Sequence, residues 1–378
     1  MTKGLSQPSS GWRGAGGTAV LGVVLILVAG LVDAAALYVP GLALLLLSIG
    51  SVLWVRSAAR GVRVTRELGG LRVVEGEPLR VEIEIRSGPI TPPSGELHDP
   101  LLAQPAPLQP GRRISRVAIS ARFARRGLRR LDPPHVVVRD PLGLASAPVR
   151  TVGEADEVLV LPRIEPVLTP GMGGDGGSAG SRRPILAALT DFDGLRPHRP
   201  GAAASRIAWL VYARSGELHD RVLRADADSR PLVVLDLRGS AAEDDLDAAV
   251  RAAASLCVHL ARLGGCALLL PGERRARVID QALRGWPAVH ARLALADSDQ
   301  TPSQNAVAAR SGALIWVSAR SLGGPPRGLV RAYGDRLIVV PGTLPGKQPR
   351  FTVAGCAGYA VGREAAQRRS PTRGGAVV

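Results

Sequence analysis

Lysine is almost absent from this sequence of 378 residues, in which Lys3 and Lys347 are the two lysines among 48 basic residues. Arginine therefore carries the formal net charge of +16. A basic balance favours anionic partners such as phospholipid headgroups or nucleic acid. Aromatic residues make up only 3% of the chain, which leaves few platforms on which bases could stack. We therefore expect a lipid surface as the anionic partner, and no nucleic acid.

Cysteine is also scarce. Cys257, Cys266 and Cys356 form no CxxC pair and have no histidine nearby at the spacing of zinc ligands, which argues against a zinc site and a disulfide framework. We expect three buried, reduced thiols. No GxSxG-type signature accompanies the dispersed histidines, so the sequence does not indicate a nucleophilic enzyme. His259 and His290 lie in helical patterns and are expected to be packed or surface residues, not ligands.

Two long apolar runs lie near the N-terminus, at residues 18–32 and 34–55. With its flanks, each is long enough to cross a hydrocarbon core about 30 Å thick. Asp33 and the turn-prone residues 38–41 interrupt the pair. The sequence therefore predicts an N-terminal segment at 1–14 and a transmembrane helical hairpin over 15–56, in contact with the lipid bilayer.

Positive charge is distributed unevenly around this hairpin. Lys3 and Arg13 precede the first run, the connecting turn carries no positive charge, and a cluster follows the second run at Arg56, Arg60, Arg63 and Arg66. By the positive-inside rule, both ends face the cytoplasm, so we expect a multi-pass protein of the inner (cytoplasmic) membrane with its bulk in the cytoplasm. A cleaved signal peptide and a core hairpin of a soluble protein are the alternatives for the apolar runs, and an inverted topology would make an envelope-facing binding module.

Strand patterns dominate residues 57–166. The segment LRVEIEIRS alternates apolar and charged residues with the period of a half-buried strand, as does RVAISARF. Proline-rich turns separate these runs, so we expect a small β-sandwich. Residues 167–184 are rich in glycine and lack the lysine of a phosphate-binding loop, which predicts a flexible linker.

Residues 230–360 alternate continuous apolar strands, such as PLVVLDL and ALIWVSAR, with helical patterns. Strands of this kind linked by helices predict a doubly wound, mainly parallel sheet covered on both faces. Residues 361–378 are basic and polar and are expected to be a disordered tail.

The loop after the first predicted strand of this α/β domain contains Asp236, Arg238 and Ser240. Ligands of open α/β sheets bind beyond the carboxyl ends of the strands. A metal-dependent von Willebrand factor A domain has Asp-x-Ser-x-Ser here, whose oxygens ligate Mg²⁺. Because Arg238 replaces the middle hydroxyl and would repel a cation, Asp236 and Ser240 are degenerate metal-site positions that we expect to be empty. We expect no catalytic residue and no cofactor.

The segment 185–229 contains the run DFDGLRPHRPG followed by SRIAWLVYARSGEL, in which Ile207 and Trp209 are spaced as on a strand. This run resembles the signature of the bacterial family named domain of unknown function 58. RFARRGLRRLDPPHVVVRDPLGL and VLVLPRIEPV also resemble the family, so the resemblance covers most of the chain. Three positions depart from the pattern: His198 stands for tyrosine, Ala202 for aspartate and Leu210 for lysine. The matching positions, which we interpret as interaction residues, are Asp191 (usually glutamate), Phe192, Gly194, Leu195, Arg196, Pro197, Gly201, Arg206, Trp209, Arg214 and Glu217.

The resemblance implies a membrane hairpin joined to a von Willebrand A-like domain, with no established catalytic activity. It also implies association with MoxR-type AAA+ ATPases and with membrane proteins that carry transglutaminase-like domains. We therefore expect a membrane-anchored, non-enzymatic adaptor that presents a cytoplasmic docking surface to an ATPase. The alternative is a metal-dependent hydrolase that uses Asp191 and Asp193, or Asp236. For the signature segment itself, a clasp that fastens the linker to the α/β domain is the other interpretation.

Overall fold

The structure is a computed structural model of the chain. It describes residues 12–150, 154–169, 195–197, 209–221, 230–240, 242–298, 301–303, 313–320 and 336–361, together with Val307, Pro326 and Leu329. The chain divides into two compact units. The N-terminal unit comprises Met1–Ala124 and Leu128–Val160, and the C-terminal unit comprises Arg125–Gly127 and Leu161–Val378.

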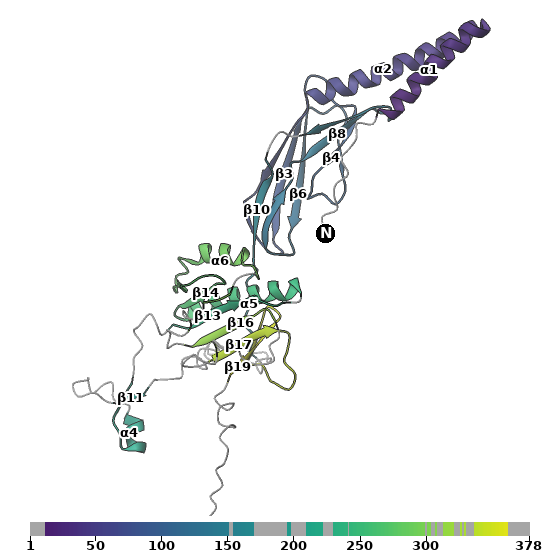
Figure 1. The fold of residues 1–378 in the computed structure, drawn as a ribbon. Coiled ribbons are helices and arrows are strands. Elements are labelled where there is room, and N and C mark those ends of the chain that lie inside the picture. The colour runs from purple at the N-terminus through teal and green to yellow at the C-terminus, as the bar shows by residue number, and fades with distance from the viewer. Residues whose placement is uncertain are drawn as a thin grey trace, which may run out of the picture. The chain divides into compact units, whose positions relative to one another are not determined.

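Two apolar helices begin the N-terminal unit, α1 (Arg13–Val32) and α2 (Tyr38–Arg60), and both are long and apolar enough to cross a membrane (Figure 1). The turn between them lies earlier than residues 38–41. Asp33 ends α1 in the left-handed conformation, with a φ of 54°, and a short 3-10 helix follows at Ala35–Leu37. Pro40 lies in the first turn of α2, where a missing backbone N–H costs no hydrogen bond.

Small residues form the seam between these helices. The buried residues of α1 are spaced by seven, and those of α2 include the same spacing, which keeps one face of each helix toward the other. A Cβ atom built on Gly22 would lie 2.8 Å from the Gly41 carbonyl oxygen, so the two backbones touch at this level. The seam residues are Ala15, Gly22 and Ala29 on α1 and Gly41, Ser48 and Ser51 on α2, whereas Val55 and Ala58 of α2 are buried in the core of the sheets.

Three small sheets follow α2 and share one core with its C-terminal turns. The alternation predicted for LRVEIEIRS is confirmed, because Leu79, Val81, Ile83 and Ile85 are buried and point away from the charged residues between them. The sheets are β1 (Arg63–Leu68), β3 (Pro78–Arg86) and β6 (Ile114–Arg122); β2 (Arg72–Val74), β10 (Asp156–Leu161) and β7 (Gly127–Leu131); and β5 (Ala106–Pro107), β4 (Ser94–His98), β8 (His135–Arg139) and β9 (Ser146–Arg150).

Arg66 does not face a membrane surface, although it belongs to the arginine cluster after the second apolar run. Its side chain is buried and pairs with Asp99 at 3.0 Å and with Asp156 at 2.7 Å. Its guanidinium also donates to the carbonyl oxygens of Leu131 and Asp132, so its N–H groups all have acceptors within the N-terminal unit. Arg66 therefore stabilises the fold of this unit, and Arg56, Arg60 and Arg63 remain as the exposed arginines of the cluster after the second apolar run.

The C-terminal unit is built on a seven-stranded sheet in the order β15-β14-β13-β16-β17-β19-β18. Its centre, β14-β13-β16-β17, is parallel, as the apolar strand patterns predict. The edge pairs β14–β15, β17–β19 and β18–β19 are antiparallel. The connections from β14 to β15 and from β18 to β19 are too short for a parallel crossover, which needs a dozen or more residues. The strands are β13 (Leu232–Asp236), β14 (Cys266–Leu269), β15 (Arg277–Ile279), β16 (Leu314–Ser318), β17 (Arg336–Pro341), β18 (Phe351–Val353) and β19 (Cys356–Ala360).

Helices α5 (Glu243–Leu263) and α6 (Trp286–Ala294) pack on one face of this sheet and share its larger apolar core. Alanines such as Ala249, Ala253 and Ala261 let α5 lie close to the strands. The other face carries a second buried cluster that includes Trp316, Ile338 and Tyr359. Both faces of the central strands are therefore buried, which is why their sequences are continuously apolar.

Candidate functional site

The signature segment is described only in part. Asp191, Phe192, Asp193, Gly194, Gly201 and Arg206 lie outside the described residues. Leu195–Pro197 form β11, which pairs antiparallel with β12 (His219–Arg221), so that Arg196 is opposite Asp220. Trp209 begins helix α4 (Trp209–Ser215), so the strand suggested by its spacing from Ile207 is wrong at this residue. Arg214 and Glu217 are exposed, in α4 and just after it.

The carboxyl ends of β13 and β16 form the point at which the strand order reverses. From β13 the chain passes through α5 to β14 on one side, and β16 later adds to the other side of β13. A crevice at such a switch point is where open α/β sheets bind their ligands. Asp236, the last residue of β13, is opposite Ser318, the last residue of β16. The predicted loop therefore lies at the place where a ligand is expected.

Asp236 is buried, and Arg238 holds its carboxylate. The guanidinium Nε donates to Oδ1 and Nη2 donates to Oδ2, both at 2.9 Å, and the Arg238 backbone N–H donates to Oδ1 at 3.3 Å. This bidentate pair raises the pKa of Arg238, chiefly through the hydrogen bonds to Asp236. The Arg238 side chain is 41% exposed, whereas that of Asp236 is 5% exposed. The pair therefore presents its cation to solvent, and its carboxylate is buried.

The serine hydroxyls near Asp236 make hydrogen bonds to the backbone of their own loops. Ser240 Oγ donates to the Ala242 carbonyl at 2.8 Å. Ser318 Oγ donates to the Arg320 carbonyl at 3.0 Å and accepts from the Arg320 backbone N–H at 3.2 Å. A Cβ atom on Gly239, whose φ is 64°, would lie 3.0 Å from Arg320 Nη1. The two arginine side chains therefore lie on the same edge of the sheet, each beyond its own strand.

These oxygens do not fit a divalent cation. Both carboxylate oxygens of Asp236 accept hydrogen bonds from a guanidinium, which cannot itself be a ligand. Binding of Mg²⁺ would require Arg238 to leave and the two serine hydroxyls to turn from their loop carbonyls. Asp236 and Ser240 are thus brought together at the expected place, but with a charge distribution opposite to that of a cation site.

Ser318 and Arg320 are the residues that the sequence argument missed. They lie more than 80 positions after Asp236 and Arg238 in the chain. The signal is a repeated pattern, because VVLDLR and IWVSAR both end an apolar strand with a polar residue, one intervening residue and an arginine. In adjacent parallel strands the same offset places the two arginines side by side.

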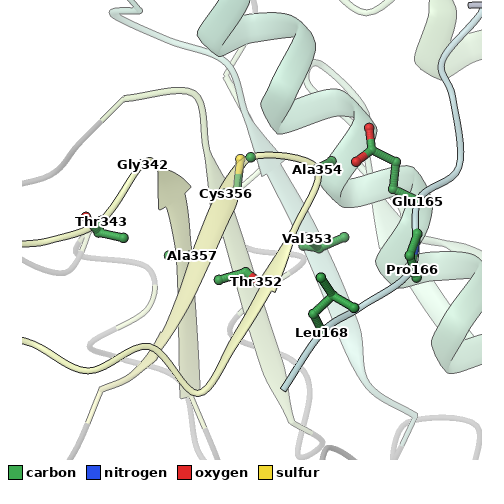
Figure 2. A pocket seen from close by; sticks show the side chains of 11 residues that line it. Glu165, Pro166, Leu168, Gly342, Thr343, Thr352, Val353, Ala354, Cys356 and Ala357 are labelled. Atoms are coloured by element: carbon green, nitrogen blue, oxygen red, sulfur yellow. The ribbon is translucent and has the colours of Figure 1, made fainter. Parts of the chain in front are cut away.

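A separate cavity of about 280 Å³ lies between the segment at Glu165–Leu168 and the β18–β19 hairpin (Figure 2). Leu168 and Thr352 exchange two backbone hydrogen bonds, of 2.8 and 2.7 Å, and form one wall. Burial raises the pKa of the Cys356 thiol to about 12. The thiol is therefore protonated near neutral pH, and this mainly apolar cavity has no activated nucleophile of that kind.

The remaining titratable candidates are packed side chains. All three cysteines are free and buried, as the sequence predicts. His290 stacks on Trp286, with ring centroids 4.9 Å apart, and its Nε2 lies 2.7 Å from the Pro162 carbonyl oxygen. Burial lowers the pKa of His290 below its ordinary 6.5. Within the described residues, no group of three or more histidine, cysteine, aspartate or glutamate side chains is placed to hold a metal ion.

No family model matches the chain, and no curated protein matches it either. The side chains at the sheet edge and the two apolar helices therefore carry the functional conclusion.

Proposed function

We propose that this chain is a membrane-anchored, non-enzymatic interaction protein. In this proposal α1 and α2 cross the inner membrane with both ends in the cytoplasm, a β-sandwich follows, and a von Willebrand A-like C-terminal unit docks an ATPase of the MoxR AAA+ type. The strand order and the parallel centre of its sheet support that unit, and the resemblance of the signature segment supports the class of partner. The hydrogen-bonded pair of Asp236 and Arg238 is the observation that carries the proposal.

That pair favours interaction over metal-dependent hydrolysis for an electrostatic reason. At 4 Å and an effective dielectric constant of 20, two unit charges repel by about 4 kcal/mol, and a divalent cation doubles this cost. A metal ion near Asp236 would meet the Arg238 guanidinium at about such a distance. The same guanidinium can attract a carboxylate of a partner, because its hydrogen bonds to Asp236 already hold it in one orientation.

The proposed docking surface is the two-arginine edge, which we define as Arg238 and Arg320. Arginine is enriched among the residues that dominate binding energy at protein interfaces, and it binds carboxylates bidentately. Asp236 neutralises one of the two positive charges, so the edge carries a net single charge. An aspartate or glutamate on the partner is the complementary group. The exposed Arg214 of the signature segment is a second candidate contact.

The proposal is tested by affinity capture of the tagged full-length protein from its native membrane, with the captured proteins identified by mass spectrometry. We expect an AAA+ ATPase with the wild type, and strong loss of it with Arg320→Glu. Because Arg320 is exposed, this variant should keep the wild-type melting temperature. Arg262→Glu on the far end of α5 is the charge-matched control, since Arg262 is also exposed.

Two results would contradict the proposal. Capture that recovers no ATPase with the wild type would remove the partner. Equal recovery with Arg320→Glu and Arg262→Glu would move the docking surface away from the sheet edge. Arg214→Ala then separates docking from clasping: a docking residue loses the ATPase at an unchanged melting temperature, and a clasp residue lowers the melting temperature while the folded fraction still binds.

A further inference from the structure

The turn between β8 and β9, residues 140–145, is fixed to the first turn of α1. The Ala15 backbone N–H donates to the Leu144 carbonyl oxygen at 2.8 Å. A Cβ atom on Gly14 would lie 3.1 Å from the Leu144 Cα, so the two backbones are in direct contact. On the neighbouring helix, Val55 and Ala58 are fully buried in the core of the N-terminal unit. This turn therefore has a fixed height along the helix pair.

That height coincides with the boundary of the hydrocarbon core when α1 crosses a bilayer. A helix of 20 residues at 1.5 Å per residue is about 30 Å long, which equals the hydrocarbon thickness. Ala15 lies two residues from the start of α1, or about 3 Å along its axis. The Arg56 guanidinium lies 4.6 Å from the ring centroid of Trp12, and tryptophan and arginine are typical of this level.

The turn is rigid and presents an apolar side chain. Asp140 exchanges backbone hydrogen bonds with the far side of the turn, through the Gly143 N–H at 2.9 Å and the Ala145 carbonyl at 3.0 Å. The Asp140 carboxylate also accepts from the Leu144 N–H at 3.3 Å. Gly143 has a φ of 71°, which favours glycine. Leu142, at the tip, is 62% exposed.

We propose that Leu142 inserts into the interfacial layer of the bilayer, so that the β8–β9 turn is a third membrane contact beside the two helices. The occupant of this apolar tip is lipid, because the turn is hydrogen-bonded to a helix at the depth where acyl chains begin. This inference rests on the proposed membrane anchoring. A rigid turn loses little conformational entropy on insertion, and the exposed arginines Arg13, Arg56 and Arg60 lie at the same end of the helices to meet anionic headgroups.

The test uses full-length protein with single cysteines labelled by an environment-sensitive fluorophore. The three native cysteines are buried, so an introduced surface cysteine is labelled selectively in the folded protein. Leu142→Cys is compared with Leu128→Cys, an aqueous control of similar exposure, 52%. Leu128 follows the far end of β6, whose eight steps from Ile114 to Arg122 span about 27 Å. Leu27→Cys, at a site 66% exposed on α1, reports the hydrocarbon core.

Each labelled protein is reconstituted into phosphatidylcholine vesicles containing phosphatidylglycerol and nitroxide-labelled lipids. We expect blue-shifted emission at position 142 with strongest quenching by nitroxides near the headgroup, quenching at position 27 by deep nitroxides, and no quenching at position 128. If position 27 is quenched and position 142 behaves like position 128, the inserted turn is refuted and the anchoring stands. If position 27 is not quenched, the anchoring fails, and the inserted turn fails with it.

Discussion

The Arg238 guanidinium engages both carboxylate oxygens of Asp236, each at 2.9 Å, at the end of the central strand β13. The two residues are separated by one position in the sequence, so the loop closes on itself with a planar, charge-assisted contact. A buried carboxylate at the carboxyl end of the central strands is thus hydrogen-bonded without any outside group.

Replacing Arg238 should convert the edge from cation-repelling to cation-binding. In Arg238→Ser the loop offers a carboxylate and two hydroxyls at alternate positions, which are hard oxygen ligands for Mg²⁺. The melting temperature of the wild type should not respond to millimolar Mg²⁺ or to chelator, whereas that of the variant should rise with Mg²⁺. An ion at 100 times its dissociation constant stabilises a fold by about 2.7 kcal/mol. Arg238→Ala, which frees the carboxylate and adds no hydroxyl, is the control.

The opposite result has a clear form. A Mg²⁺-dependent rise in the wild-type melting temperature, lost in Asp236→Ala, would show that the ion displaces the Arg238 guanidinium from Asp236. That outcome would favour the hydrolase alternative.

Gly22 should be essential to the packing of α1 on α2. A Cβ atom there would lie 2.8 Å from the Gly41 carbonyl oxygen, and a backbone atom cannot move aside as a side chain does. We expect Gly22→Leu to destabilise the helix pair by about 1–3 kcal/mol, the usual cost of overpacking. Gly50→Leu is the matched control on α2, because a Cβ atom there meets nothing within 4 Å. Unfolding in mixed detergent micelles measures both, and equal losses would contradict the seam.

The stability of the C-terminal unit should decrease below pH 6.5. Burial lowers the pKa of His290, and of His259, in the fold, whereas the unfolded chain takes up these protons near the ordinary value of 6.5. The free energy of unfolding is therefore unaffected by protonation of these two histidines above pH 6.5. It decreases as the pH falls from 6.5 toward their lowered pKa values, since in that range the unfolded chain binds protons that the folded chain does not.

Thermal unfolding between pH 5 and 8 measures this dependence. His290→Gln keeps a donor for the Pro162 carbonyl and removes one titrating group, so its stability should depend less on pH. Identical pH profiles for the variant and the wild type would exclude His290 as the source.

The orientation of the helices is tested by a reporter fused after Val378. Exposed arginines lie at the C-terminal end of α2, at Arg56 and Arg60, and just after it at Arg63. The turn between the helices carries no positive charge, so a reporter active only in the cytoplasm should be active. A matched fusion within the turn, after Ala34, should be inactive. Activity from the turn fusion, and none after Val378, would reverse the topology.

Much of the candidate site could be predicted because its main contact is local. Asp236 and Arg238 are two positions apart after an apolar strand, so both the loop and the conflict between a cation and the guanidinium are visible in the sequence. Ser318 and Arg320 could not be placed there, since their proximity to Asp236 depends on β16 adding next to β13. Signature residues such as Asp191 and Arg206 lie outside the described residues, and their interaction role stays a prediction.

The two apolar helices, the alternating strand β3 and the continuous central strands could all be predicted from the residue pattern, because hydrophobic periodicity is a local property of the chain. The position of the turn between α1 and α2, the antiparallel edges of the sheet and the burial of Arg66 among carboxylates and carbonyls became visible only in the folded chain. It also placed Leu144, in the turn between β8 and β9, against the first turn of α1. These features arise from contacts between residues far apart in the chain, whose partners no local pattern identifies.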